Sequence, residues 1–136
     1  MADTMQFDLV SPERMLMSTK AAEVQIPGAD GDLTAMPGHS ALITTLRPGI
    51  LKVVADGQTV EFAVTGGFAE VSPEGVTVMA ERSLPRGELT GSVMKDWVAE
   101  ARQAHAEAHP TVADEAAKLL ADMVAMGTHI GLDSGE

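Results

Sequence analysis

The sequence has no cysteine and no tyrosine, and its 136 residues include only three phenylalanines and one tryptophan. Without cysteine the protein can form neither disulfides nor thiolate metal sites, so packing has to provide the stability of the fold. The scarcity of aromatic side chains weakens the case for a small-molecule site, because such pockets are usually lined with aromatic and converging polar groups. A stand-alone ligand-binding β-sandwich is therefore disfavoured, although it remains an alternative.

Basic residues and long apolar runs are also scarce. Nine Lys and Arg stand against twenty Asp and Glu, which gives a formal net charge of −11. An acidic protein repels a phosphate backbone or an anionic lipid surface, so we expect no nucleic-acid partner and no direct lipid insertion. No stretch reaches the roughly 18 consecutive apolar residues of a membrane helix. Met1–Thr4 lacks the basic segment of a signal peptide, so we expect the protein to stay in the cytosol or an equivalent compartment.

Composition divides the chain near Gly87. Residues 1–88 hold six of the seven prolines and nine of the thirteen glycines, whereas residues 89–136 contain ten alanines and a single proline. A chain of this length can bury roughly two thirds of its unfolded surface, enough for one core and a small appendage. We predict a β-sandwich domain over residues 1–87. We predict a helical hairpin over residues 88–136, with a short disordered tail.

The first part predicts short strands separated by turns. Met5–Val10 alternates apolar and polar residues and stops at Ser11-Pro12, a pair that often starts turns. Lys20–Ile26 predicts a second half-buried strand with apolar residues on one face. The residues of that face are Ala22, Val24 and Ile26.

Two motifs indicate hairpins. Asp56-Gly57 lies between two apolar runs, and both residue types tolerate the positive φ of a two-residue primed turn. Ser72-Pro73-Glu74-Gly75 similarly separates Phe68–Val71 from Val76–Ala80. Gly66-Gly67 lacks the Lys-Ser/Thr of a phosphate loop and suits a bulge or a close backbone approach. Strands at about ten-residue spacing favour an antiparallel sandwich or flattened barrel.

The second part changes to helical periodicity. Apolar residues at intervals of three or four predict a helix over about Thr90–Ala108. Its apolar face comprises Leu89, Val93, Trp97, Ala101, Ala104 and Ala108. Pro110 interrupts the pattern, and Thr111 offers an N-cap for a second helix. The stripe of that helix comprises Val112, Ala116, Leu119, Leu120, Met123, Val124 and Met126. Because a buried methyl group contributes only ~0.8 kcal/mol, we expect this Ala-rich hairpin to be held more weakly than the sandwich core.

Few residues suggest catalysis or metal binding. His105 and His109 lie four residues apart on one predicted helix face, a spacing found in zinc-binding helices. Glu107 falls on the opposite face and no third ligand can be identified, so a solvated helix is preferred and a small metal-dependent enzyme is an alternative. His39 has no nucleophile with a convincing partner, which favours a turn or interface role. Asp30-Gly31-Asp32 lacks the spaced ligands of a calcium loop and predicts an exposed acidic turn.

Five blocks of sequence, in order and with matching gaps, resemble the ε subunit of the F-type ATP synthase, which is called δ in mitochondria. They are Phe7–Glu13, Gly31–Leu42, Leu46–Gly49, Gly66–Val71 and Val76–Ala80. The resemblance covers nearly all of residues 5–86. It implies a ten-stranded antiparallel β-sandwich followed by an α-helical hairpin, in agreement with the division of the composition. It also implies a non-catalytic subunit with no cofactor, no metal and no catalytic residue.

Members of that family sit in the central rotor stalk, where the sandwich joins the γ subunit to the membrane ring of c subunits. The resemblance therefore implies γ and the c-ring as partners, and a role in coupling proton translocation to ATP synthesis. By position, the c-ring interface would comprise Ala29, Asp30, Gly31, Asp32 and Leu33. The γ interface would comprise Gly38, His39, Ser40, Ala41 and Leu42.

The helical part departs from the pattern of the inhibitory members. Some members carry an Ile/Leu-Asp-x-x-Arg-Ala motif that binds ATP, but Leu89–Met94 lacks both the Asp and the Arg. The whole part has only Lys95, Arg102 and Lys118 as basic residues. A sparse cationic surface gives little attraction for an acidic partner. We therefore expect weak or absent inhibition, weak or absent ATP binding, and at most transient contact with the α and β subunits.

The expected location follows from the same resemblance. Because the chain shows no transit peptide, a bacterial source is favoured. The subunit would then lie peripherally at the cytoplasmic face of the inner membrane, as part of the ATP synthase complex.

Overall fold

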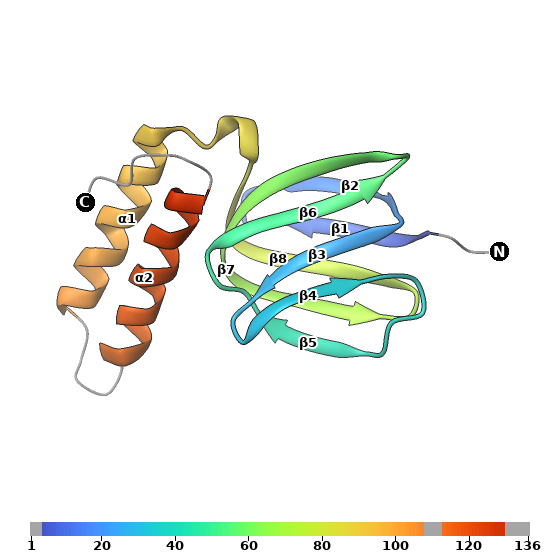
Figure 1. Cartoon of the computed structure of the whole chain (residues 1–136), viewed down its shortest axis with the longest axis horizontal. Coiled ribbons are helices and arrows are strands. Elements are labelled where there is room, and N and C mark those ends of the chain that lie inside the picture. Colours follow the sequence, from blue (N-terminus) through green and yellow to red (C-terminus); the bar gives the residue numbers. More distant parts are fainter. Residues whose placement is uncertain (1–3, 108–112, 130–136) are drawn as a thin grey trace. The chain divides into compact units, whose positions relative to one another are not determined.

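The computed structural model describes residues 4–107 and 113–129, and the chain divides into two compact units, Met1–Arg86 and Gly87–Glu136. Within the described residues, the first unit has eight strands and the second has two α-helices (Figure 1). The strands are β1 (Met5–Val10), β2 (Met15–Ala21), β3 (Glu23–Gly28), β4 (Gly31–Ala35), β5 (Leu42–Thr45), β6 (Gly49–Ala55), β7 (Gln58–Ser72) and β8 (Gly75–Pro85). The 3-10 helix η1 (Arg86–Glu88) precedes α1 (Gly91–Glu107) and α2 (Ala113–His129). The predicted change from strands to helices is confirmed.

The long strand β7 belongs to both layers of the sandwich. It pairs with β6 from Gln58 to Val64 and with β5 from Phe68 to Val71. Its neighbour β8 pairs with it on one side and with β1 on the other. The β-sandwich is therefore confirmed. The described residues form eight strands where the resemblance implied ten, because β7 and β8 each continue from one layer into the other without a break.

Two glycines allow β7 to bend between the layers. Gly66 and Gly67 have φ angles of 69° and 90°, a region that residues with a side chain rarely adopt. A Cβ atom on Gly67 would lie 1.9 Å from the carbonyl oxygen of Met79 on β8. The backbone amide of Leu46 also donates to the Gly67 carbonyl oxygen at 3.0 Å. The close backbone approach predicted from the Gly-Gly pair is confirmed.

The predicted turns form where the sequence indicates them. Asp56 and Gly57, with φ angles of 52° and 74°, connect β6 to β7 in a two-residue hairpin. The turn after Ser72 joins β7 to β8, and its first and last residues pair across the hairpin. Ser11 and Arg14 exchange backbone hydrogen bonds of 2.9 and 3.2 Å, which closes the turn between β1 and β2.

The prediction of one continuous strand over Lys20–Ile26 is wrong. β2 ends and β3 begins on either side of Ala22, which is exposed instead of lying on the buried face. The Ala22 amide donates to the carbonyl oxygen of Val54 on β6 at 2.8 Å. Ala21 and Val24 are both fully buried, three positions apart. The alternation is therefore shifted at this point, where the chain leaves the edge of β1 and begins to pair with β6.

One pair of neighbouring strands departs from the predicted antiparallel arrangement. β1 lies parallel to β8, with Leu9 opposite Val78. A tight hairpin makes its two strands antiparallel, whereas parallel strands need a long connection. Nearly the whole sandwich lies between β1 and β8 in the sequence, so no hairpin fixes their relative direction.

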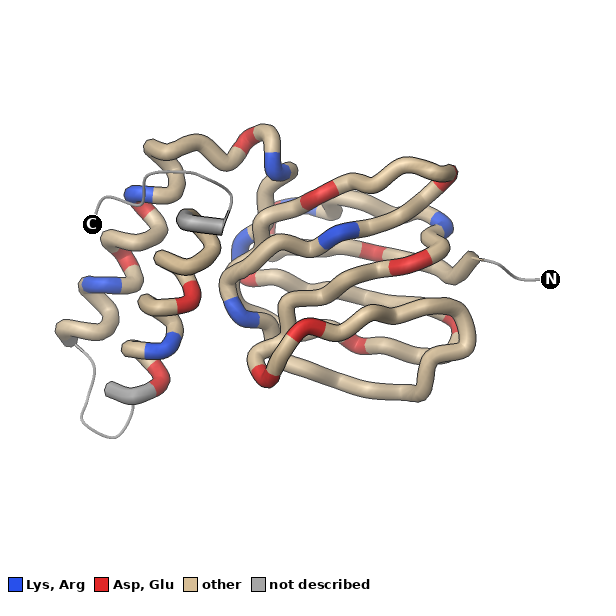
Figure 2. The backbone as a smooth tube through the Cα atoms, in the orientation of Figure 1, with Lys and Arg blue, Asp and Glu red and all other residues tan. Residues whose placement is uncertain are grey.

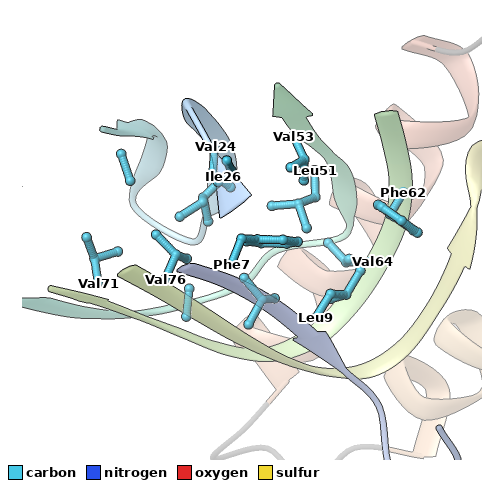
Figure 3. Close-up of a cluster of buried hydrophobic side chains, with 14 of the residues drawn as sticks. Phe7, Leu9, Val24, Ile26, Leu51, Val53, Phe62, Val64, Val71 and Val76 are labelled. Carbon is cyan, nitrogen blue, oxygen red and sulfur yellow. The ribbon is translucent and has the colours of Figure 1, made fainter. Parts of the chain in front are cut away.

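A cluster of buried hydrophobic side chains fills the space between the layers (Figure 3). Phe7 of β1 is fully buried, and its ring points toward side chains of β3 and β6 that include Ile26 and Leu51. The alternation predicted for Met5–Val10 is confirmed, because its three apolar odd-numbered residues are buried. Full burial of a side chain of this size contributes about 2–3 kcal/mol. The core therefore supports the sandwich without a disulfide.

α1 and α2 contact each other and run in opposite directions (Figure 1), so the helical hairpin is confirmed. The Thr90 hydroxyl accepts a hydrogen bond from the Val93 amide at 3.2 Å and caps the start of α1. Met123 and Met126 are buried residues of α2. Neither described helix is long and apolar enough to cross a membrane.

The buried face of α1 is rotated relative to the predicted one. Met94 and Val98 are fully buried, whereas Ala104 is exposed. Trp97 and Ala101 are buried as predicted. The difference has a simple cause, because larger apolar side chains gain more from burial than a methyl group does. The calls at Ala108, His109, Pro110, Thr111 and Val112 lie outside the described residues.

Candidate protein-binding surfaces

The described residues bring together no group of three His, Cys, Asp or Glu that could hold a metal ion. His105 is exposed near the end of α1. Its predicted companion, His109, lies outside the described residues, so the pair is not seen together. His39 lies in the loop after β4, with its Nδ1 atom 2.7 Å from the Ser40 carbonyl oxygen. This histidine is thus held by its own loop.

The predicted acidic turn forms the tip of the hairpin between β3 and β4. Ala29 and Asp30 are its two central residues, because Gly28 and Gly31 pair with each other across the hairpin. Asp30, Gly31 and Asp32 are exposed, while Ala29 and Leu33 are half-buried. Gly31 has a φ of 136°. Figure 2 shows acidic residues scattered over both units, so the turn is one of several acidic positions and charge alone does not mark it.

One basic residue that the sequence did not single out supports this turn. Arg47 donates from Nη1 to the Gly28 carbonyl oxygen at 2.6 Å and from Nη2 to the Asp32 carboxylate. Its side chain is 28% exposed, against 76% for Asp32. Arg47 belongs to the Leu46–Gly49 block, where the Pro-Gly pair indicates a turn but no local pattern indicates what the arginine binds.

The predicted segment Gly38–Leu42 forms an exposed loop that leads into β5. Gly38 has a φ of 86°, and its amide donates to the Pro73 carbonyl oxygen at 3.0 Å. The His39 amide donates to the Met36 carbonyl oxygen at 3.1 Å. The first bond connects the loop to the turn between β7 and β8, and the second closes the loop on itself. Leu42, the first residue of β5, is 40% exposed.

A row of five apolar side chains, four of them exposed and Val10 half-buried, was not predicted from the sequence. It crosses five strands, and we call it the apolar row: Met15 on β2, Val10 on β1, Met79 on β8, Phe68 on β7 and Ile43 on β5. Met15 is opposite Val10, Val10 is opposite Met79, and Met79 is opposite Phe68. Ile43 is opposite Glu70, two residues along β7 from Phe68 on the same face. Ile43 is 67% exposed and Met15 is 60% exposed.

The apolar row spans four inter-strand spacings, or about 19 Å. It also begins where the Gly38–Leu42 loop ends, because Ile43 directly follows Leu42. The sequence does show apolar residues at positions of these strands where alternation predicts polar ones. It does not show the pairing register that lines these residues up across five strands.

The sandwich, the helical hairpin and the exposed apolar row are together typical of a subunit that functions within a larger assembly. The family described as ATP synthase, Delta/Epsilon chain, beta-sandwich domain matches residues 4–86. The chain belongs to this family, and it is a stalk subunit of the complex and not a catalytic one.

Relatives of similar length support this assignment. The chain is 64% identical to the ATP synthase epsilon chain of Rhodobacter capsulatus over 132 residues, which cover 97% of this chain and 100% of the relative. It is 59% identical to the epsilon chain of Paracoccus denitrificans, over 98% of this chain and 95% of the relative. These relatives are bacterial proteins.

Solved structures share the fold. A chain of the Euglena gracilis mitochondrial ATP synthase, in a structure of its OSCP, F1 and c-ring, has a TM-score of 0.72 at 20% identity. The match covers 94% of this chain and 82% of that one. A chain from the central stalk and c-ring of the Tetrahymena thermophila mitochondrial ATP synthase has a TM-score of 0.65 at 16% identity, covering 93% and 95%.

Proposed function

We propose that this chain joins the γ subunit of a bacterial ATP synthase to the c-ring, so that rotation driven by proton flow reaches the catalytic head. The observation that carries the proposal is the apolar row, together with the Gly38–Leu42 loop that runs into it. The two structural neighbours come from assemblies that include a c-ring, and one of these assemblies is a central stalk with its c-ring. A peripheral location at the cytoplasmic face of the inner membrane follows from this role.

The γ subunit is the partner proposed for the apolar row and the Gly38–Leu42 loop. Burial of exposed apolar area drives most protein association, at about 25 cal/mol per Å². Ile43 and Met15 expose most of their surface in this chain and would lose it on binding. Mixing the purified chain with γ and following their co-elution tests this contact directly. Separate elution at micromolar concentrations would contradict it.

The acidic turn is the part proposed to meet the c-ring. Its two central residues project from the end of the β3–β4 hairpin, with Asp30 exposed to solvent. Polar loops of the ring, and not lipid, would be the partner, so the net negative charge of the chain is compatible with the contact.

Asp30→Lys is expected to lower the affinity for the ring about tenfold, because reversing one charge in a complementary contact replaces attraction with repulsion. Membrane vesicles with the assembled enzyme would pump fewer protons for each ATP hydrolysed. Glu115→Lys is the matched control, since it makes the same charge change at an exposed position of α2. Unchanged coupling in the Asp30→Lys variant would show that the turn does not contact the ring.

The helical unit is proposed to have little inhibitory effect. Lys118, one of its three basic residues, is already paired with Asp122 of its own helix at 2.6 Å. This intrahelical pair lowers the attraction that Lys118 could offer to an acidic partner.

Deleting residues 89–136 is therefore expected to leave ATP hydrolysis by the assembled complex unchanged. The sandwich should stay folded, because its core cluster contains no residue of the helical unit. Hydrolysis rates of complexes with the full and the shortened chain would be compared at equal enzyme concentration. Several-fold activation on deletion would show that the helices inhibit after all.

A further inference from the structure

We propose that Arg47 is the positioning residue of the β3–β4 turn, which it holds in the shape presented to the ring. The inference rests on the proposed function of this turn. It starts from two contacts that one guanidinium makes at once. Nη1 donates to the Gly28 carbonyl oxygen at 2.6 Å, and Nη2 donates to the Asp32 carboxylate. The two acceptors lie on opposite strands of the hairpin, so Arg47 bridges it just below its tip.

Backbone hydrogen bonds fix the same two segments to each other. The Arg47 amide donates to the Pro27 carbonyl oxygen at 3.0 Å, and the Ala29 amide donates to the Thr45 carbonyl oxygen at 2.8 Å. Gly28 and Leu46 form an isolated antiparallel bridge between these bonds. The segment from Thr45 to Arg47 therefore runs alongside the base of the turn, and the Arg47 side chain extends this contact toward the tip.

Two glycines allow tight packing within the hairpin and beside it. A Cβ on Gly28 would lie 2.7 Å from the Gly31 carbonyl oxygen, and a Cβ on Gly49 would lie 2.7 Å from the Cβ of Pro27. Both distances are too short for a real side chain. The Gly28 backbone is thus packed against the Gly31 backbone within the hairpin, and the Gly49 backbone against the Pro27 ring. Arg47 reaches across this packed region to the Gly28 carbonyl oxygen.

The arrangement suits arginine specifically. A guanidinium is a planar fork that can donate to two acceptors in fixed directions, whereas the lysine ammonium acts as a single point charge on a flexible stem. Pairing with Arg47 compensates the charge of Asp32 and restrains its side chain. Asp30 and Asp32 are both exposed, but Asp32 is paired with Arg47, so Asp30 is the acid of the turn whose charge stays uncompensated. A turn restrained in this way can transmit sideways force without bending.

The test compares four variants of the full chain. Arg47→Ala removes both contacts, Asp32→Asn removes the ion pair alone, and Arg47→Lys keeps the charge with a different geometry. Lys20→Ala is the control, because it removes one basic charge at an exposed position of β2. Amide exchange at Ala29, measured by NMR, reports on the turn. Protons pumped for each ATP hydrolysed, measured with the assembled enzyme in vesicles, report on the ring contact.

Arg47→Ala should accelerate exchange of the Ala29 amide about tenfold or more, because it removes two charge-assisted hydrogen bonds, and it should lower coupling. Arg47→Lys should restore part of both readouts, and Asp32→Asn should fall between Arg47→Ala and the unchanged chain. A merely structural role would lower global stability without this graded recovery of coupling.

Three outcomes overturn the inference, and they differ in what else they affect. If Asp30→Lys weakens coupling while Arg47→Ala does not, the turn meets the ring but Arg47 does not position it. If neither variant changes coupling, the proposed contact of the turn itself fails. Unchanged exchange at Ala29 in the Arg47→Ala variant would also contradict the positioning role, whatever the coupling.

Discussion

Replacing Gly67 with alanine should lower the free energy of unfolding by about 4 kcal/mol, the sum of left-handed backbone strain and overpacking. Two causes act together at this position. Its φ of 90° is unfavourable for any residue with a side chain, and the new Cβ would lie 1.9 Å from the Met79 carbonyl oxygen. The obstacle is backbone in a central strand pair, so it cannot rotate away. Urea unfolding followed by circular dichroism measures the loss.

Gly38→Ala separates the two causes. Gly38 has a nearly equal φ of 86°, but no atom outside Gly38 and its two chain neighbours lies within 4 Å of the position that a Cβ would take. Only the conformational strain remains, so the expected loss is about 1 kcal/mol. Equal losses in the two variants would mean that the crowding between β7 and β8 does not matter, and that the bend can relax to accept a side chain.

The double variant Met15→Glu with Ile43→Glu should weaken binding to γ about 100-fold or more, since burying two unpaired carboxylates in an apolar contact is strongly unfavourable. These two residues are the most exposed members of the apolar row. Substituting them should leave the sandwich core undisturbed. Binding would be measured by calorimetry with purified γ, and folding by the thermal unfolding midpoint.

A matched double variant controls for added charge. Gln58→Glu with Thr59→Glu adds the same two carboxylates at exposed positions near the β6–β7 turn, away from the apolar row. Its affinity for γ should stay close to that of the unchanged chain. If both double variants bind γ equally well, the apolar row is not the γ surface. If both lose binding equally, the effect comes from net charge.

Local chemistry explains which parts of the fold could be predicted from the sequence. A two-residue hairpin turn requires positive φ angles, which few residue pairs tolerate. The pair Asp56-Gly57 tolerates and adopts them, so it identifies the hairpin in the sequence. The alternation of Met5–Val10 predicts its buried face because a strand repeats every two residues. Both features depend on residues that are close in the sequence, and both are confirmed.

Features that depend on distant pairing could not be predicted in this way. The shift at Ala22 reflects the exchange of one neighbouring strand for another, which no local pattern encodes. The apolar row exists because the registers of five strands line up Phe68 with Met79 and Met79 with Val10. The role of Arg47 likewise required the fold, since 19 residues separate it from the Gly28 carbonyl that it binds. Such sites appear only when the strands are assembled.

The continuity of β7 has a mechanical consequence. Where two layers are connected only by loops, a load on one layer passes to the other mainly through side-chain contacts. Here a single unbroken strand pairs with β6 in one layer and with β5 in the other. A load applied to either layer therefore travels along covalent bonds, which yield far less than van der Waals contacts do. A body built in this way can be twisted as one piece.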